Sequence, residues 1–259
     1  MIFSVILLLT LTQGITEFLP ISSSGHLVLI PFFIEIPYQG KTFDVVLHFG
    51  SLIAVIFYLK DEILKILRDL VSTDRFTTRG FYFLKCMFFA TLPVLLVGFI
   101  TNLYKFEFEK LIEIVGWTTL IFGVLLGIAD KIKIKKKSSP FLNDSIIIGF
   151  MQSISIVPGV SRSGIVITTA RFLGYNRLEA SKFSLFLSIP VIFAAMTLKS
   201  FNLFEKGEIT YSTDLIIGFV LSLIFSFLAI KLFMKYIEKA SLQVFVFYRI
   251  ILGLMILYF

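Results

Sequence analysis

The sequence predicts an all-α polytopic membrane protein, built as an inverted repeat of a re-entrant helical hairpin followed by three transmembrane helices. Three observations predict this class: the apolar composition, the length of the apolar runs, and two apolar segments broken by proline, serine and glycine. Hydrophobic residues make up 57% of the chain and charged residues 16%, and the mean hydropathy is +0.95. Such a composition is typical of a chain that lies mostly in lipid.

Six apolar runs are long enough to cross a bilayer, because a helix rises about 1.5 Å per residue and the hydrocarbon core requires about 20 residues. They lie at 43–60, 81–101, 112–130, 180–198, 213–233 and 241–259. No soluble domain remains, so residues 1–259 are predicted to form one integral membrane domain. The N-terminal run has no basic flank or small-residue cleavage site, which predicts no cleaved signal peptide. The single cysteine, Cys86, cannot form an internal disulfide.

The net charge of +7 is distributed according to membrane orientation. Basic residues gather in alternate loops: Lys65, Arg68, Arg75 and Arg79, then the run Lys131 to Lys137, then Lys231, Lys235 and Lys239. By the positive-inside rule these loops are cytoplasmic, so both termini and the first hairpin are expected on the outer side of the membrane. The lysine run would also suit a polyanion, but its place in the alternation disfavours a nucleic-acid partner. The oligomeric state is left open.

Two apolar segments, residues 1–36 and 144–175, do not fit the spanning pattern. Each has a short apolar half, a Pro/Ser/Gly cluster and a second short half, and neither half is long enough to cross alone. Broken helices are tolerated at membrane depth only where their freed backbone groups are buried in protein or line a wet cavity. Both segments are therefore predicted to be re-entrant hairpins.

The two broken segments align at an offset of 139 residues. Identical residues then coincide at five positions: Gln13 with Gln152, Ile15 with Ile154, Ser22 with Ser161, Ser24 with Ser163 and Gly25 with Gly164. We infer repeats at 1–130 and 144–259, joined by a basic cytoplasmic linker at 131–143. Three spans per repeat invert the second copy. Inverted repeats bring their broken helices together near the midplane, with half-helix N-termini turned toward an anion.

The first break reads QGITEFLPISSSGH. Gln13 and Glu17 are four residues apart, so an amide and a carboxylate share one helix face. After the proline, the next half-helix opens with Ser22, Ser23, Ser24, Gly25 and His26. Free N–H groups and the helix dipole at such a start favour an anion. Capping or close packing is the alternative role of Ser22 and Ser24.

The second break reads PGVSRSG, where Gly159, Ser161 and Ser163 surround Arg162. A guanidinium in an apolar segment is costly and usually functional, and its planar fork suits bidentate binding of phosphate. The alternative is a structural ion pair between Arg162 and Glu17 that links the two hairpins. His48, within the first span, is ambiguous between a structural and a functional residue, and the structural interpretation is favoured.

These two segments, in this order and spacing, resemble the signature regions of the undecaprenyl-diphosphate phosphatase family, which is associated with bacitracin resistance. The resemblance implies hydrolysis of the terminal phosphate from a C55 polyprenyl diphosphate, which regenerates the carrier for cell-wall synthesis. The family's Glu/Gln-x-x-x-Glu pattern falls on Gln13 and Glu17, its serine and histidine on Ser23 and His26, and its Pro-Gly-x-Ser-Arg-Ser pattern on Pro158 to Ser163. Val166 stands where the family commonly has a threonine.

Phosphoryl transfer requires positioning, charge neutralisation and an in-line nucleophile. The hypothesis assigns Arg162 and the half-helix N–H groups to the phosphates, and Ser23 to nucleophilic attack with Glu17 or His26 as its base. His26 is the competing nucleophile. A divalent cation, Mg²⁺ or Ca²⁺, would be held partly by Glu17, with the diphosphate supplying further oxygen ligands because Gln13 replaces a second carboxylate.

The alternative function is a secondary transporter or lipid flippase, because inverted repeats with paired broken helices also build transporters. Ser23 beside a base favours the enzyme, since transport requires a binding site but no nucleophile.

Overall fold

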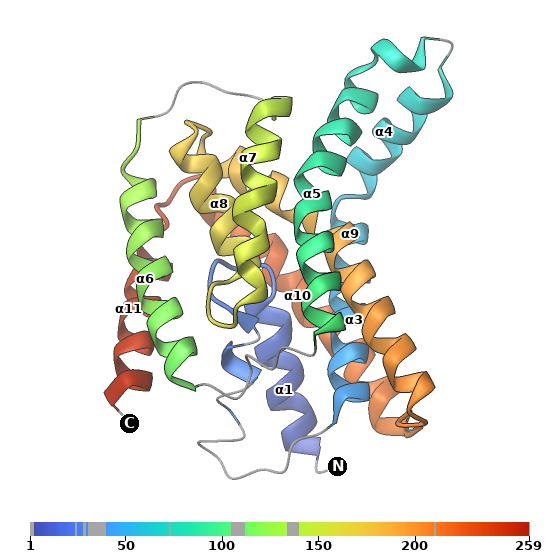
Figure 1. Ribbon diagram of the computed structural model, residues 1–259, viewed down its shortest axis with the longest axis vertical. Helices are drawn as coiled ribbons and strands as arrows, with labels where there is room; N and C mark the ends of the chain where they lie inside the picture. The colour runs from blue at the N-terminus through green and yellow to red at the C-terminus, as the bar shows by residue number, and fades with distance from the viewer. Residues whose placement is uncertain are drawn as a thin grey trace.

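The computed structural model describes residues 3–23, 25–27, 30, 40–72, 74–104, 112–133, 140–209 and 211–258. Within these ranges the chain is helical and contains no β-strand (Figure 1). The α-helices are α1 (Phe3–Thr16), α3 (Lys41–Tyr58), α4 (Lys60–Val71), α5 (Arg79–Leu103), α6 (Ile112–Asp130), α7 (Leu142–Ser153), α8 (Arg162–Phe172), α9 (Arg177–Glu205), α10 (Thr213–Ile237) and α11 (Gln243–Tyr258). Two 3₁₀ turns, η1 (Arg75–Thr77) and η3 (Ile154–Ile156), complete the described elements. The predicted all-α class is confirmed.

Five helices are long and apolar enough to cross a membrane: α3, α5, α6, α9 and α10. They coincide with five of the six predicted spans. The sixth, predicted at 241–259, corresponds to α11, which is apolar but has only 16 residues. Since a bilayer requires about 20 helical residues, the structure supports a multi-pass protein without establishing six spans.

The second broken segment consists of two short helices. α7 has 12 residues and α8 has 11, and the chain between them passes through η3 and a non-helical turn at 157–161. In the first broken segment α1 ends at Thr16 and a turn follows over 17–20. The predicted break is thus present in both segments, although part of the first, including Ser24, lies outside the described residues.

Helix α4 was not anticipated from the apolar runs. It begins one residue after α3 ends, at Lys60, and has no buried residues. Charged and apolar residues alternate with helical period along it, so it reads as a loop when only apolar length is counted. A Lys182 to Glu62 ion pair of 2.8 Å joins it to α9. Exposed pairs of this kind contribute about 0–1 kcal/mol, so α4 is held mainly by the α3 and α5 connections.

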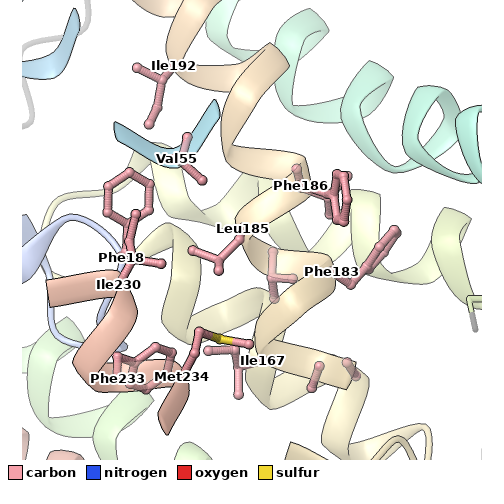
Figure 2. Close-up of a cluster of buried hydrophobic side chains, with 14 of the residues drawn as sticks. Phe18, Val55, Ile167, Phe183, Leu185, Phe186, Ile192, Ile230, Phe233 and Met234 are labelled. Atoms are coloured by element: carbon pink, nitrogen blue, oxygen red, sulfur yellow. The ribbon is translucent and has the colours of Figure 1, made fainter. Parts of the chain in front are cut away.

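The first break is buried within the bundle. Phe18, in the turn after α1, is 1% exposed and belongs to the main hydrophobic cluster. Figure 2 shows it beside side chains of α3 and α10, with the α8 and α9 side chains of the cluster adjacent. Non-helical backbone at membrane depth is stable when protein covers it, and this packing supplies the cover.

Glycine allows the broken helices to approach their neighbours closely. A Cβ on Gly14 of α1 would lie 3.0 Å from the backbone nitrogen of Ser226 in α10. A Cβ on Gly149 of α7 would lie 2.8 Å from the carbonyl oxygen of Ala90 in α5. Both broken helices therefore pack against a long helix through backbone contact, which fixes the position of each broken helix along its neighbour.

Candidate active site

Glu17 is the centre of the polar cluster at the first break. Its Oε2 accepts hydrogen bonds from Gln13 Nε2 at 3.0 Å and from Ser23 Oγ at 2.7 Å. Its Oε1 lies 3.4 Å from Arg162 Nη2, and His48 Nε2 lies 3.6 Å from Oε2. The Glu17 side chain is only 8% exposed. A buried carboxylate is stable when donors and cations surround it in this way.

The hydroxyl of Ser23 is directed at that carboxylate. The 2.7 Å separation lies within the hydrogen-bonding range expected of a nucleophile and its base. Glu17 can hold this position because the α1 backbone continues to it through a 3.0 Å bond from its N–H to the Gln13 carbonyl. The sequence did not decide whether Glu17 or His26 is the base for Ser23. In the structure, Ser23 donates a hydrogen bond to Glu17.

His26 is engaged at both ring nitrogens. Its Nδ1 lies 2.6 Å from the carbonyl oxygen of Ser22, and its Nε2 is hydrogen-bonded to the hydroxyl of Tyr248. A carbonyl only accepts, so Nδ1 carries the proton in a neutral ring and Nε2 accepts from the phenol. The two rings are 9° from parallel. No hydrogen bond between His26 and Ser23 occurs among the described residues.

Arg162 is the first residue of α8 and connects the two breaks. Its Nη1 donates to the carbonyl oxygen of Ser184 in α9 at 3.0 Å, while Nη2 faces Glu17. The side chain is 11% exposed. The carbonyl contact orients the guanidinium so that its Nη2 is directed toward the polar cluster.

Ser161 and Ser163 support the start of α8. Ser161 is the N-cap, and its Oγ accepts from the Gly164 N–H at 3.1 Å. It has a φ of 70°, a left-handed conformation that is strained for a residue with a side chain. Ser163 Oγ donates to the Leu19 carbonyl at 2.7 Å, so the second break is also bonded to the turn of the first.

Gly159 satisfies two constraints that no other residue meets easily. Its φ is 87°, and a Cβ would lie 2.7 Å from the carbonyl oxygen of Val115 and overlap the Thr118 hydroxyl. The backbone of the second break is therefore pressed directly against α6.

The structure brings together most of the predicted site residues. Those that meet around one carboxylate are Gln13, Glu17, Ser23 and Arg162. Those that form the adjoining turns are Ser22, His26, Gly159, Ser161 and Ser163. Ser24 lies outside the described residues, and its role stays a prediction.

Comparison of the sequence with known proteins identifies one family. The family model described as bacitracin resistance protein BacA matches residues 6–255. The chain belongs to this family. The undecaprenyl-diphosphatase of Campylobacter curvus is 41% identical over 259 residues, covering 98% of this chain and 97% of that protein. The undecaprenyl-diphosphatase of Pelagibacter ubique is 40% identical over 257 residues, covering 97% of this chain and 95% of that protein. The resemblance found in the two signature regions is confirmed.

Three residues of this BacA-family site were missed or undervalued by sequence reasoning. His48 was interpreted as structural, yet it lies beside Glu17. Tyr248 and Arg249 were taken as part of an apolar span. Arg249 is the one charged residue in 241–259, so the signal that drew attention to Arg162 was also present there.

The residues that could hold a cation are few. Among the described residues no group of three His, Cys, Asp or Glu side chains is clustered as metal ligands usually are. Near Glu17, however, the Oε1 of Gln13 is buried and has no hydrogen-bond partner. One carboxylate and one unpartnered amide oxygen are hard ligands of the kind that Mg²⁺ and Ca²⁺ prefer.

Proposed function

We propose that this protein hydrolyses undecaprenyl diphosphate to undecaprenyl phosphate and inorganic phosphate, which returns the lipid carrier to cell-wall synthesis. The single observation that carries the proposal is the Ser23 hydroxyl 2.7 Å from a buried carboxylate that also faces Arg162. The names of the full-length relatives support the same activity. A nucleophile, a base and a phosphate-binding cation are the groups that this hydrolysis requires.

The proposed reaction has two steps. Arg162 and the half-helix N–H groups bind the diphosphate, and Ser23 Oγ attacks the terminal phosphorus while its proton passes to Glu17. The bond to the bridging oxygen breaks, and undecaprenyl phosphate leaves. Glu17 passes that proton to the departing phosphate and is again a carboxylate. Water then attacks the phosphoserine, Glu17 accepts the water proton and gives it to Ser23 Oγ as the P–O bond to the serine breaks, and inorganic phosphate is released. Charge neutralisation and alignment supply most of the rate enhancement in such transfers.

Mg²⁺ or Ca²⁺ is part of the proposal. Glu17 and the Oε1 of Gln13 would hold the cation together with diphosphate oxygens. When bound it would neutralise phosphate charge. Because the protein itself offers so few oxygen ligands, tight binding is expected only in the presence of the diphosphate.

The role of His26 can be tested through Tyr248. We expect Tyr248→Phe to lower turnover by roughly three- to tenfold, because losing one hydrogen bond of about 1 kcal/mol leaves the imidazole less well oriented. Phosphate release and the melting temperature would be measured on one preparation, with His26→Ala alongside. Turnover above that of the wild type would instead favour His26 as the nucleophile, since the variant frees its Nε2.

The enzyme can be separated from the transporter alternative in detergent, where no second compartment exists. Purified protein with undecaprenyl diphosphate and Mg²⁺ or Ca²⁺ should release inorganic phosphate, and a chelator should abolish the release if the cation is required. Saturable binding of the lipid with no phosphate release under either cation would contradict the hydrolase and favour transport.

The inverted repeat belongs to the proposal as well, with α11 as the sixth span and both broken segments re-entrant. Helix packing supports it: α1 packs against α10 as α7 packs against α5, while α3 pairs with α9 and α6 with α11. These contacts are the ones expected if the matching pairs are α1 with α7, α3 with α9, α5 with α10 and α6 with α11. Both described ends of the chain lie at the end of the bundle opposite α4 (Figure 1), as an even total of six spans requires.

The orientation of this fold in the bacterial plasma membrane gives a further prediction. In a Cys86→Ala background, a membrane-impermeant maleimide should label Tyr258→Cys in intact cells and Lys133→Cys only after permeabilisation. The positive-inside rule places the basic loops in the cytoplasm. Both termini, and the opening of the candidate active site, are then expected on the outer side. The reverse labelling pattern would exclude this orientation, and labelling of both positions from one side would exclude the inverted repeat.

A further inference from the structure

Arg249 is a buried cation outside the proposed chemistry. It lies in α11, is 1% exposed, and is among the largest fully buried side chains of the described residues. Its Nε donates to the Thr119 carbonyl at 3.2 Å, and its Nη1 to the Pro20 carbonyl at 3.3 Å. Its Nη2 donates to the carbonyls of Gly159 and Val160 at 2.9 and 3.0 Å.

These four carbonyls belong to three separate parts of the fold. Thr119 lies in α6, Pro20 in the first break, and Gly159 and Val160 in the second. One guanidinium therefore bonds both breaks to each other and to α6. Its planar fork makes this possible, since the five N–H donors point in fixed directions that an ammonium group does not reproduce.

Two glycines leave the space that the Arg249 side chain occupies. A Cβ on Gly164 in α8 would lie 2.8 Å from Arg249 Nη1, and a Cβ on Gly123 in α6 would lie 2.8 Å from Arg249 Cβ. The adjoining crevice, which His26 and Tyr248 also line, is too narrow to admit water. Within the described part of the chain no carboxylate is paired with the guanidinium, and its N–H groups face four carbonyl dipoles instead.

A buried charge without a carboxylate partner is expensive, and a purely apolar side chain would pack at lower cost. The positions of the carbonyls that accept its hydrogen bonds indicate why a buried arginine is retained here. Pro20 lies three residues before Ser23, and Gly159 lies three residues before Arg162. These two acceptors each lie at the turn that precedes one proposed catalytic side chain.

We propose that Arg249 is a positioning residue that holds the two breaks in register, so that Ser23 and Arg162 meet the same phosphate. This inference rests on the roles proposed above for those two residues. A shift of about 1 Å between a nucleophile and a bound phosphate costs about a hundredfold in rate, so the register of the two turns decides turnover. Substrate affinity depends less on it, because either turn can still bind phosphate.

Arg249→Lys tests this proposal, with Arg171→Lys as the matched control. Arg171 is 2% exposed and also donates to three backbone carbonyls, those of Asp130, Ile132 and Tyr175, but none belongs to a break. We expect Arg249→Lys to lower kcat about 30- to 100-fold with KM changed by about threefold at most. Arg171→Lys should lower the melting temperature similarly and keep kcat within about threefold of the wild type.

Two further variants extend the test, and the first of them covers the case in which Arg249→Lys fails to fold. Gly164→Ala retains Arg249 but crowds its guanidinium, so kcat should fall with little change in KM. The Arg249→Lys, Arg162→Lys double variant, where it folds, should lose less than the product of the two single effects, because one residue acts through the other.

The proposal is overturned if Arg249→Lys, or Gly164→Ala where the first does not fold, keeps wild-type kcat, or if the Arg249 and Arg162 effects multiply independently. Failure of the proposed catalytic roles gives a different result, since Ser23→Ala and Arg162→Lys would then remain active themselves.

Discussion

Ser23→Ala is expected to reduce turnover by roughly three to five orders of magnitude, because removing a nucleophile leaves only binding and charge stabilisation to act on the substrate. The structural basis is the 2.7 Å hydrogen bond from Ser23 Oγ to Glu17 Oε2. Phosphate release from undecaprenyl diphosphate measures the loss. The melting temperature should change little, since the hydroxyl contributes one hydrogen bond in a partly buried position.

Ser22→Ala is the matched control one residue earlier. Ser22 Oγ accepts from the Gly25 N–H at 3.2 Å and so caps the start of the second half-helix. Loss of such a cap costs about 1 kcal/mol of stability and should reduce turnover only modestly. The nucleophile assignment therefore predicts very unequal effects from two neighbouring serines. If both variants keep near-full turnover while His26→Ala is inactive, attack by serine is wrong and His26 takes its place.

The long helices of the fold could be predicted from the length of the apolar runs in the sequence. Lipid exposure selects about 20 apolar residues per span, and five of the predicted spans are helices of that kind. Helix ends depend on local bonds that hydropathy does not register. α5 begins where Thr78 caps the Phe81 N–H at 3.2 Å, and α4 begins at Lys60, with only Leu59 between it and the end of α3. The short length of α11 was missed for the same reason.

Some residues of the candidate site could be predicted from the sequence and others could not. Gln13, Glu17, Ser23 and Arg162 were predicted to meet because the two broken segments share one pattern, and the structure brings these four together. Arg249 and Tyr248 could not be assigned to the site, because an apolar helix gives no periodic signal of which face turns inward. Arg249 bonds to residues 89 to 229 positions away, and such contacts are visible only once the bundle is assembled.

Arg162→Lys is expected to lower kcat/KM by about two to three orders of magnitude, because an ammonium keeps the charge but cannot form the planar, bidentate contact with phosphate. The variant should still fold and purify, since lysine preserves a cation near Glu17. An Arg162→Lys protein with wild-type kcat/KM would show that charge alone suffices and would remove the planar clamp from the mechanism.

The contact between Arg162 and Glu17 means that the structural alternative must be tested directly. Their closest atoms are 3.4 Å apart, and both side chains are largely buried. Removing either charge leaves the other unpaired, at a cost of about 3–5 kcal/mol, so Arg162→Met and Glu17→Gln should each destabilise the protein. The double variant removes both charges, so no unpaired charge stays buried and the protein should recover much of its stability.

Activity separates the two roles of the pair. If Arg162 and Glu17 serve only to join the hairpins, the double variant should regain phosphate release together with its melting temperature. If Arg162 binds phosphate and Glu17 accepts the proton of Ser23, the double variant should melt like the wild type and remain inactive, because a methionine cannot bind an anion and a glutamine amide cannot accept that proton. Measuring both quantities on the same four preparations decides between them. We expect the double variant to recover stability without activity, since the ion pair stabilises the fold while the reaction requires Arg162 to exchange Glu17 for the substrate.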